Sequence, residues 1–236
     1  MIKLPVKVRV EQAVYGNFPF WHRGYAVLAH SAGCRPEWLT ELRTVCQRCG
    51  EPPAGLIPTD SLFALRLKCG PWMIVGTRPQ GRDDQDRPGA LAFHALFVNP
   101  WAYRWIGANP FALAGSVRGD WTGADRDRTL SPIIWTVGET TTPSPSTPAS
   151  DDDPRLAQVL NALTQRRRVV VQSSEPIDGL ARSVWRTLPR SIRRRATVAT
   201  WAFDNANHFD LVGLPKLAGV ALNPSDLILA LENAGR

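Results

Sequence analysis

Apolar residues along this chain follow two spacings, one typical of strands and one typical of helices. Near the start, Val6, Val8 and Val10 alternate with charged residues, which predicts a strand. From Pro36 onward, apolar residues recur every three or four positions, which predicts a helix that ends before Gly50. Strand and helix patterns then keep alternating through both halves of the chain. The sequence therefore predicts an α/β (mixed α+β) fold in which helices flank a mixed sheet.

Two segments indicate how that sheet is built. Large apolar residues alternate with Ala, Arg and Lys over 63–68, and a Cys-Gly-Pro turn then leads into 72–76. This pattern predicts a hairpin and hence a sheet that is not purely parallel. Residues 91–98 are apolar on both faces except at His94, as in a strand covered on both sides. We expect His94 to be buried and hydrogen-bonded to a backbone group. Further strands are predicted over 24–29, 133–137, 169–171 and 196–203, and further helices from Pro154, over 176–188 and over 223–235.

Composition predicts one globular domain. Of the 236 residues, 44% are hydrophobic and 21% charged, enough for an ample core. The segment 139–153 is rich in Thr, Ser and Pro and closes on three aspartates, so we interpret 1–236 as a single domain interrupted there by a disordered loop. The chain has neither a signal-peptide pattern nor an apolar run of about 18 residues, so we expect a cytoplasmic protein with reduced cysteines and no membrane partner.

The net charge comes from one segment. Residues 166–195 hold nine arginines against Glu175 and Asp178, which accounts for the whole net charge of +7. On the helix predicted there, arginines one turn apart lie opposite the apolar stripe, and more arginines follow. This surface could be merely solvated, or could bind an acidic protein or a nucleic acid. The candidate partner-binding residues are Arg182, Arg186, Arg190, Arg193, Arg194 and Arg195.

Tryptophans bear on the same question. The chain has nine, and Trp21, Trp101, Trp105 and Trp121 fall in predicted turns and short segments. We expect most to lie in the core. Any exposed tryptophan would favour a binding surface, since tryptophan and arginine are common anchors at protein interfaces.

One serine offers an enzymatic alternative. Ser31 lies in Ala29-His30-Ser31-Ala32-Gly33, which approximates the Gly-x-Ser-x-Gly elbow of serine hydrolases, and Asp204 and His208 follow in the order of that class. However, the predicted helix begins only at Pro36, and alanine replaces the first glycine. We therefore expect Ser31 not to be a nucleophile.

Two further motifs limit the chemistry. Cys46-Gln47-Arg48-Cys49 has the spacing of a zinc or redox pair, but no second pair exists and both cysteines lie on the apolar stripe at the end of a helix, where the helix dipole disfavours a thiolate. We expect them to be buried, reduced and free of metal. No Gly-x-x-x-x-Gly-Lys-Ser/Thr loop is present, so the chain is not itself a P-loop GTPase, and no cofactor is predicted.

Three groups of short sequence motifs, which we call phrases, occur in a fixed order along the chain and carry a family resemblance. They are Gln12-Ala13-Val14-Tyr15-Gly16 with Gly24-Tyr25, then Arg87-Pro88-Gly89 with His94-Ala95-Leu96, then Leu188-Pro189 with Arg193-Arg194-Arg195-Ala196-Thr197. Together they resemble the N-terminal domain of bacterial GTPase-associated proteins. The resemblance implies a separate GTPase as partner within a multi-protein system, and it supplies no catalytic residue. We therefore expect a non-catalytic interaction or regulatory module rather than an enzyme.

Overall fold

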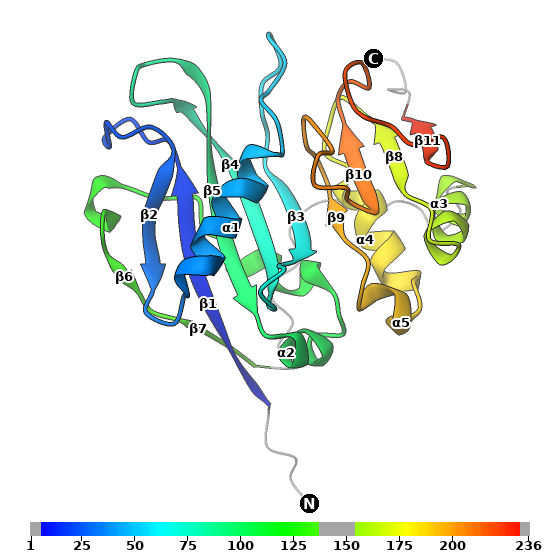
Figure 1. Cartoon of the computed structure of the whole chain (residues 1–236), viewed down its shortest axis with the longest axis horizontal. Helices are drawn as coiled ribbons and strands as arrows, with labels where there is room; N and C mark the ends of the chain where they lie inside the picture. Colours follow the sequence, from blue (N-terminus) through cyan, green and yellow to red (C-terminus); the bar gives the residue numbers. More distant parts are fainter. Residues whose placement is uncertain (1–5, 137–153, 232–236) are drawn as a thin grey trace, which may run out of the picture.

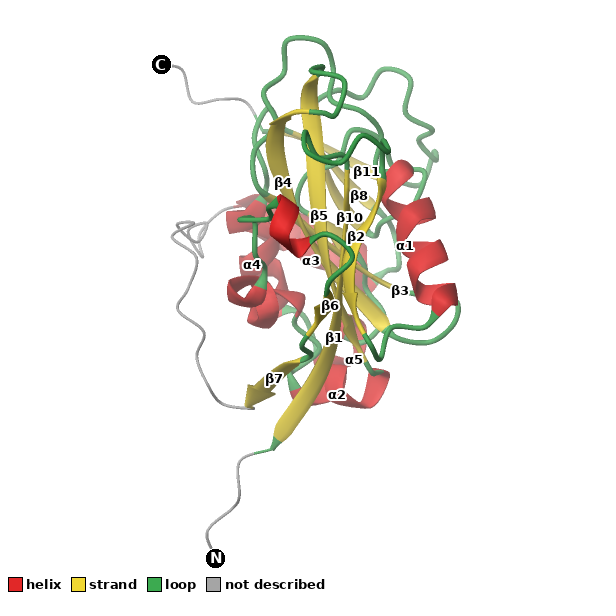
Figure 2. Cartoon of the chain, turned by 90° about the vertical axis from the view of Figure 1, so that its left-hand side faces the viewer, coloured by secondary structure: helices red, strands yellow, loops and turns green. Residues whose placement is uncertain are grey.

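The computed structural model describes residues 6–136 and 154–231 of the chain. In these residues, eleven strands form one mixed sheet in the order β11-β8-β10-β9-β3-β4-β5-β1-β2-β6, and β7 pairs with the start of β1 (Figure 1). Helices lie on both faces of this sheet (Figure 2). The mixed α/β prediction is therefore confirmed, while the predicted loop 139–153 lies outside the described residues.

The larger part of the sheet is antiparallel. Its strands are β1 (Lys7–Gly16), β2 (Ala26–Ser31), β3 (Ser61–Arg66), β4 (Trp72–Arg82), β5 (Pro88–Val98) and β7 (Ile133–Thr136), with the short β6 (Thr129–Leu130) parallel to β2. The predicted hairpin is β3 and β4, where Phe63 faces Val75. Strand β5 is central, because Leu96 lies between Ile74 of β4 and Gln12 of β1.

The smaller part of the sheet is parallel and joins the rest through one short strand. Its members are β8 (Val169–Gln172), β9 (Val198–Ala199), β10 (Leu211–Leu214) and β11 (Leu227–Ala230). Strand β9 pairs with β10 on one side and antiparallel with β3 on the other. The strand predicted over 196–203 thus shortens to two residues.

The prediction of a helix over 223–235 is wrong for the described residues, which contain β11 instead. Leu227 and Leu229 pack against the core, whereas Ile228 between them is exposed. This period of two fits a strand, and pairing with β8 satisfies the backbone on one side. A short apolar run of this kind does not distinguish a strand from a helix until its neighbour is known.

Helix α1 (Pro36–Gln47) covers one face of the sheet, and the other α-helices cover the opposite face (Figure 2). The latter are α2 (Pro100–Trp105), α3 (Pro154–Thr164), α4 (Asp178–Thr187) and α5 (Arg190–Arg193), with the 3₁₀ turns η1 (Pro110–Ser116) and η2 (Gly123–Asp125) between α2 and β6. Proline begins α1 as predicted. Just past its end, Gly50 has φ +79° and lies against the backbone of Phe203, where a Cβ would come within 3.0 Å, so glycine fits this position best.

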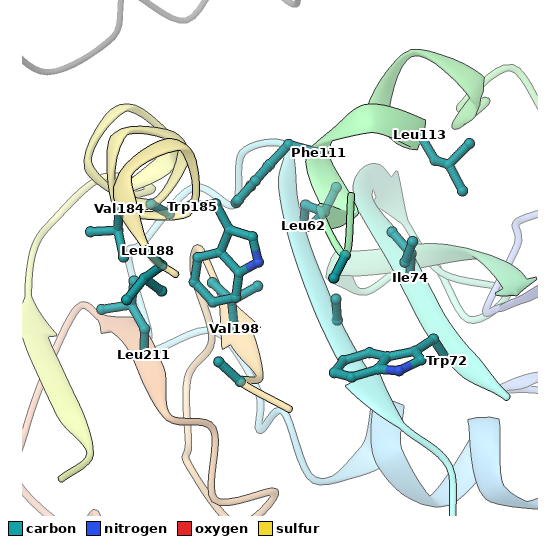
Figure 3. Close-up of a cluster of buried hydrophobic side chains, with 14 of the residues drawn as sticks. Leu62, Trp72, Ile74, Phe111, Leu113, Val184, Trp185, Leu188, Val198 and Leu211 are labelled. Atoms are coloured by element: carbon teal, nitrogen blue, oxygen red, sulfur yellow. The ribbon is translucent and has the colours of Figure 1, made fainter. Parts of the chain in front are cut away.

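The core is divided between the two faces because the central strands are buried on both sides. In β3, Phe63 points to the α1 face, while Leu62 and Ala64 point to the other. In the close-up of that second face, Trp185 from α4 lies over the sheet (Figure 3). Trp72 of β4 stacks on Tyr103 of α2 at 4.2 Å between ring centroids, which fixes α2 against the sheet.

Candidate protein-binding surface

The short helix α2 presents two exposed tryptophans. The side chain of Asn99 accepts a hydrogen bond from the backbone N–H of Trp101 (2.9 Å) and so begins the helix. Tyr103 faces the core, which turns Trp101 and Trp105, one helical turn apart, toward solvent. They are 58% and 43% exposed, and their rings meet edge to face with centroids 5.4 Å apart.

Helix α5 places one arginine against the backbone of α2. Ile192 anchors the helix in the core, while Arg190 and Arg194, four positions apart, are exposed. The Arg190 guanidinium donates a hydrogen bond to the backbone carbonyl of Arg104 in α2 (2.5 Å). Helices α2 and α5 therefore form one corner at the lower edge of the sheet in Figure 1. We call it the arginine–tryptophan surface; it consists of Trp101, Arg104, Trp105, Arg190, Arg194 and Arg195.

Positive charge on this surface is not neutralised within the described chain. The ion pairs among residues 6–136 and 154–231 include none of its four arginines. A partner carboxylate could approach these guanidinium groups without displacing one already bound. Arginine and exposed tryptophan are the residue types that most often anchor interfaces.

Two of the predicted binding arginines have a structural role as well. Arg182 is half-buried on α4, and its guanidinium lies 5.0 Å from the centre of the Phe111 ring, whereas Arg186 on the same helix is exposed. Arg193 is also half-buried, close to Tyr103. The Nε atoms of Arg182 and Arg193 are buried. The expectation of one exposed face is thus correct for Arg186 and too simple for Arg182, because α4 packs against η1 on that side.

The arginines of residues 166–195 form separate groups in the structure, and the first group lies away from α5. Arg168 pairs with Asp226 through two nitrogen–oxygen contacts of 3.0 Å, and Arg167 donates to the carbonyl of Ser225 (2.9 Å). These residues tie the start of β8 to the loop before β11. They therefore help to hold the edge of the sheet together and are separate from the surface on α2 and α5.

Ser31 is an internal structural residue. It is fully buried; its hydroxyl donates to a carboxylate oxygen of Glu11 (2.6 Å) and accepts from the backbone N–H of Gln12 (2.9 Å). Gly33 closes this turn so tightly that a Cβ would lie 2.3 Å from the Glu11 carboxylate. Helix α1 begins only at Pro36, so no helix start faces Ser31. The geometry gives no support to a nucleophile at this position.

Asp204 and His208 lie in another part of the sheet. Both are in the loop before β10, which five strands separate from β2, so they lie roughly 30 Å from Ser31 at the usual strand spacing. Arg168 donates to Nδ1 of His208 (2.9 Å), and Asp204 accepts from the backbone N–H of Asn205. The structure does not bring the three hydrolase candidates together.

The cysteine pair is buried as predicted. Cys46 and Cys49 lie between α1 and the sheet, and burial raises the pKa of Cys46 well above its usual range and that of Cys49 to about 12. All four cysteines are free thiols in this structure. Within the described ranges, no three His, Cys, Asp or Glu side chains cluster in a way that could hold a metal ion. In the same residues, no helix has both the length and the apolar character needed to cross a bilayer.

The first two family-like phrases meet in the structure. Tyr15, Tyr25 and Arg87 all line one cleft. His94 bonds to Gln12 of the first phrase through a contact of 2.8 Å. The third phrase contributes Arg193 and its neighbours to α5, away from this cleft.

Sequence reasoning only partly anticipated this site. Of the four tryptophans in turns and short segments, Trp21 and Trp121 are buried, and only Trp101 and Trp105 are exposed. Arg104 was not among the predicted residues; its position between these two tryptophans was the available signal. Comparison with family models, with curated proteins and with solved structures gave no match for this chain.

Proposed function

We propose that this protein is a non-catalytic interaction module that binds an acidic protein partner through the arginine–tryptophan surface. The observation that carries the proposal is the exposed Trp101/Trp105 pair on α2, together with the contact of Arg190 with the same helix, in a described chain whose ion pairs leave out Arg104, Arg190, Arg194 and Arg195. The resemblance to GTPase-associated proteins supports a separate GTPase as that partner. A regulatory role in such a system would follow from binding alone and needs no catalytic group.

Each part of the surface has its own expected contribution. The arginines attract an acidic partner over a distance and so raise the association rate, whereas the indole rings lose water on contact and slow dissociation. Because the tryptophan rings already pack on each other, their side chains lose little conformational freedom on binding. The two residue types should therefore affect different rate constants.

The test begins with capture of the partner from the native host by the tagged chain, followed by binding kinetics with the purified partner. Arg190→Glu/Arg194→Glu should slow association about tenfold or more at low salt, with a smaller effect at high salt. Trp101→Ala/Trp105→Ala should mainly speed dissociation, by about tenfold or more. The matched control is Arg43→Glu/Arg48→Glu, an equal charge change on α1 and its C-cap at the opposite face.

Nucleic-acid binding is the competing function. Single-stranded nucleic acids usually follow a basic groove with successive stacking platforms, whereas the surface here is one compact corner. A labelled oligonucleotide assay separates the two functions. If both variants melt normally and bind the protein partner at unchanged rates, the proposal fails; if they lose only oligonucleotide binding, the nucleic-acid function replaces it.

A further inference from the structure

A half-open cleft of about 880 Å³ lies at one end of the central strands β1, β4 and β5, and the arginine–tryptophan surface lies at the other end. One wall is the segment 50–58 after α1, and the other is the hairpin end of β4 and β5; both rise above the upper edge of the sheet in Figure 1. The hairpin turn is fixed by Asp84, which accepts from the backbone N–H of Gly24 (2.7 Å). The cleft therefore has a second wall that is tied to the rest of the fold.

The lining is aromatic and rich in proline. Tyr15, Tyr25 and Phe93 line the cleft, with Tyr15 5.7 Å from Tyr25 and 6.0 Å from Phe93 between ring centroids. Tyr15 and Phe93 are almost wholly buried, so Tyr25 presents the ring that an occupant would contact. Because proline fixes φ, the walls lose little conformational freedom when an occupant binds. The five prolines are Pro52, Pro53, Pro58, Pro79 and Pro88.

Tyr25 provides a hydrogen-bond donor in this lining. Its side chain is nearly half exposed, and its hydroxyl oxygen already accepts from the backbone N–H of Leu91 (3.2 Å). Burial raises the pKa of the hydroxyl, and nearby Glu51 raises it further, so the group keeps its proton at neutral pH. That proton is free to be donated to a carbonyl of an occupant.

The remaining charge at the cleft is negative. Asp83 is bound to the Arg87 side chain (2.7 Å) and to two backbone N–H groups, so these opposite charges neutralise each other. Glu51 is exposed and belongs to none of the ion pairs in the described part of the chain. A carboxylate beside an exposed tyrosine ring favours a cationic group at that end of the cleft.

We propose that this cleft binds an extended, proline-containing peptide segment with a basic residue at the end near Glu51. Small-molecule sites usually enclose most of their ligand, whereas a half-open cleft leaves one side of a peptide in water. Aromatic-lined grooves recognise polyproline II segments, which are already extended and lose little entropy on binding. This peptide site is separate from the proposed GTPase-binding surface and does not depend on it.

The probe is the blocked peptide Arg-Pro-Leu-Pro-Pro-Leu-Pro, followed by backbone amide NMR shifts and calorimetry. We expect shifts centred on Gly89 and Leu91 and saturable binding. Replacing its prolines with alanine should weaken binding at least tenfold, and replacing its arginine with glutamate should weaken binding by a similar factor. Glu51→Gln should remove the preference for the arginine peptide over the glutamate peptide, and Tyr25→Phe should weaken binding about fivefold, the loss of one hydrogen bond.

Two results would overturn the proposal. The first is the absence of shifts around the cleft at millimolar peptide in a protein that melts normally. The second is equal binding of the proline and alanine peptides. If Tyr25→Phe fails to fold, Glu51→Gln and the peptide pair still decide the question. Trp101→Ala/Trp105→Ala should bind the peptide normally; loss of binding there would place the peptide on the arginine–tryptophan surface and reject the cleft.

Discussion

His94 should make the protein less stable in mild acid, because it is buried in the neutral form. It lies on the central strand β5, only 1% exposed, with its ring edge to face with Trp121. Its Nδ1 faces the backbone N–H of Arg118 (2.9 Å), which can only donate, so Nδ1 accepts and the proton belongs on Nε2. Nε2 in turn donates to the side-chain oxygen of Gln12 (2.8 Å). A second proton would break the bond from Arg118.

The sign and size of the effect follow from the pKa of His94. Burial, with a smaller contribution from the charge of Arg118, lowers this pKa from 6.5 to about 3 in the folded protein. Between these values the unfolded chain binds a proton that the folded protein does not, so stability falls as pH falls through this window. At about pH 4.5, His94 alone should reduce the free energy of unfolding by roughly 2 to 3 kcal/mol relative to neutral pH.

The assay compares urea unfolding of the wild type and of His94→Gln at about pH 7.5 and pH 4.5. Glutamine can donate and accept hydrogen bonds as the neutral histidine does, but it does not titrate in this range. Carboxylates titrate equally in both proteins and cancel in the comparison. The wild type should lose roughly 2 to 3 kcal/mol more than the variant on acidification. Equal losses, within about 0.5 kcal/mol, would refute the buried neutral histidine.

Three further outcomes test the rest of the structure. Ser31→Ala should lower the free energy of unfolding by about 1 to 3 kcal/mol, because it leaves buried polar groups unpaired, and a fluorophosphonate probe should not label the wild-type serine. In native protein a thiol reagent should modify exposed Cys69 first, and Cys46 and Cys49 only after unfolding; rapid native reaction of that pair would contradict their burial. Arg182→Glu should destabilise the fold by about 1 to 2 kcal/mol in thermal melts through loss of its contact with Phe111, and an unchanged melt would show that this contact contributes nothing.

Strong local signals in the sequence determined several elements. Proline at the start of α1 and the apolar stripe behind it predicted both the helix and the burial of Cys46 and Cys49. The two-sided apolar run around His94 predicted the central strand β5. These elements could be predicted because many consecutive residues agree on one period and because both faces of the strand are covered.

Only the tertiary structure decided the short elements and the candidate sites. The run at Leu227–Ala230 becomes a strand because β8 offers an open edge, and β9 is limited to the two residues that reach both β3 and β10. Trp101 and Trp105 are exposed because Tyr103 holds the opposite side of a six-residue helix against Trp72. So short a helix has no periodicity that identifies its buried face, and a surface built from separate segments exists only once their packing brings them together.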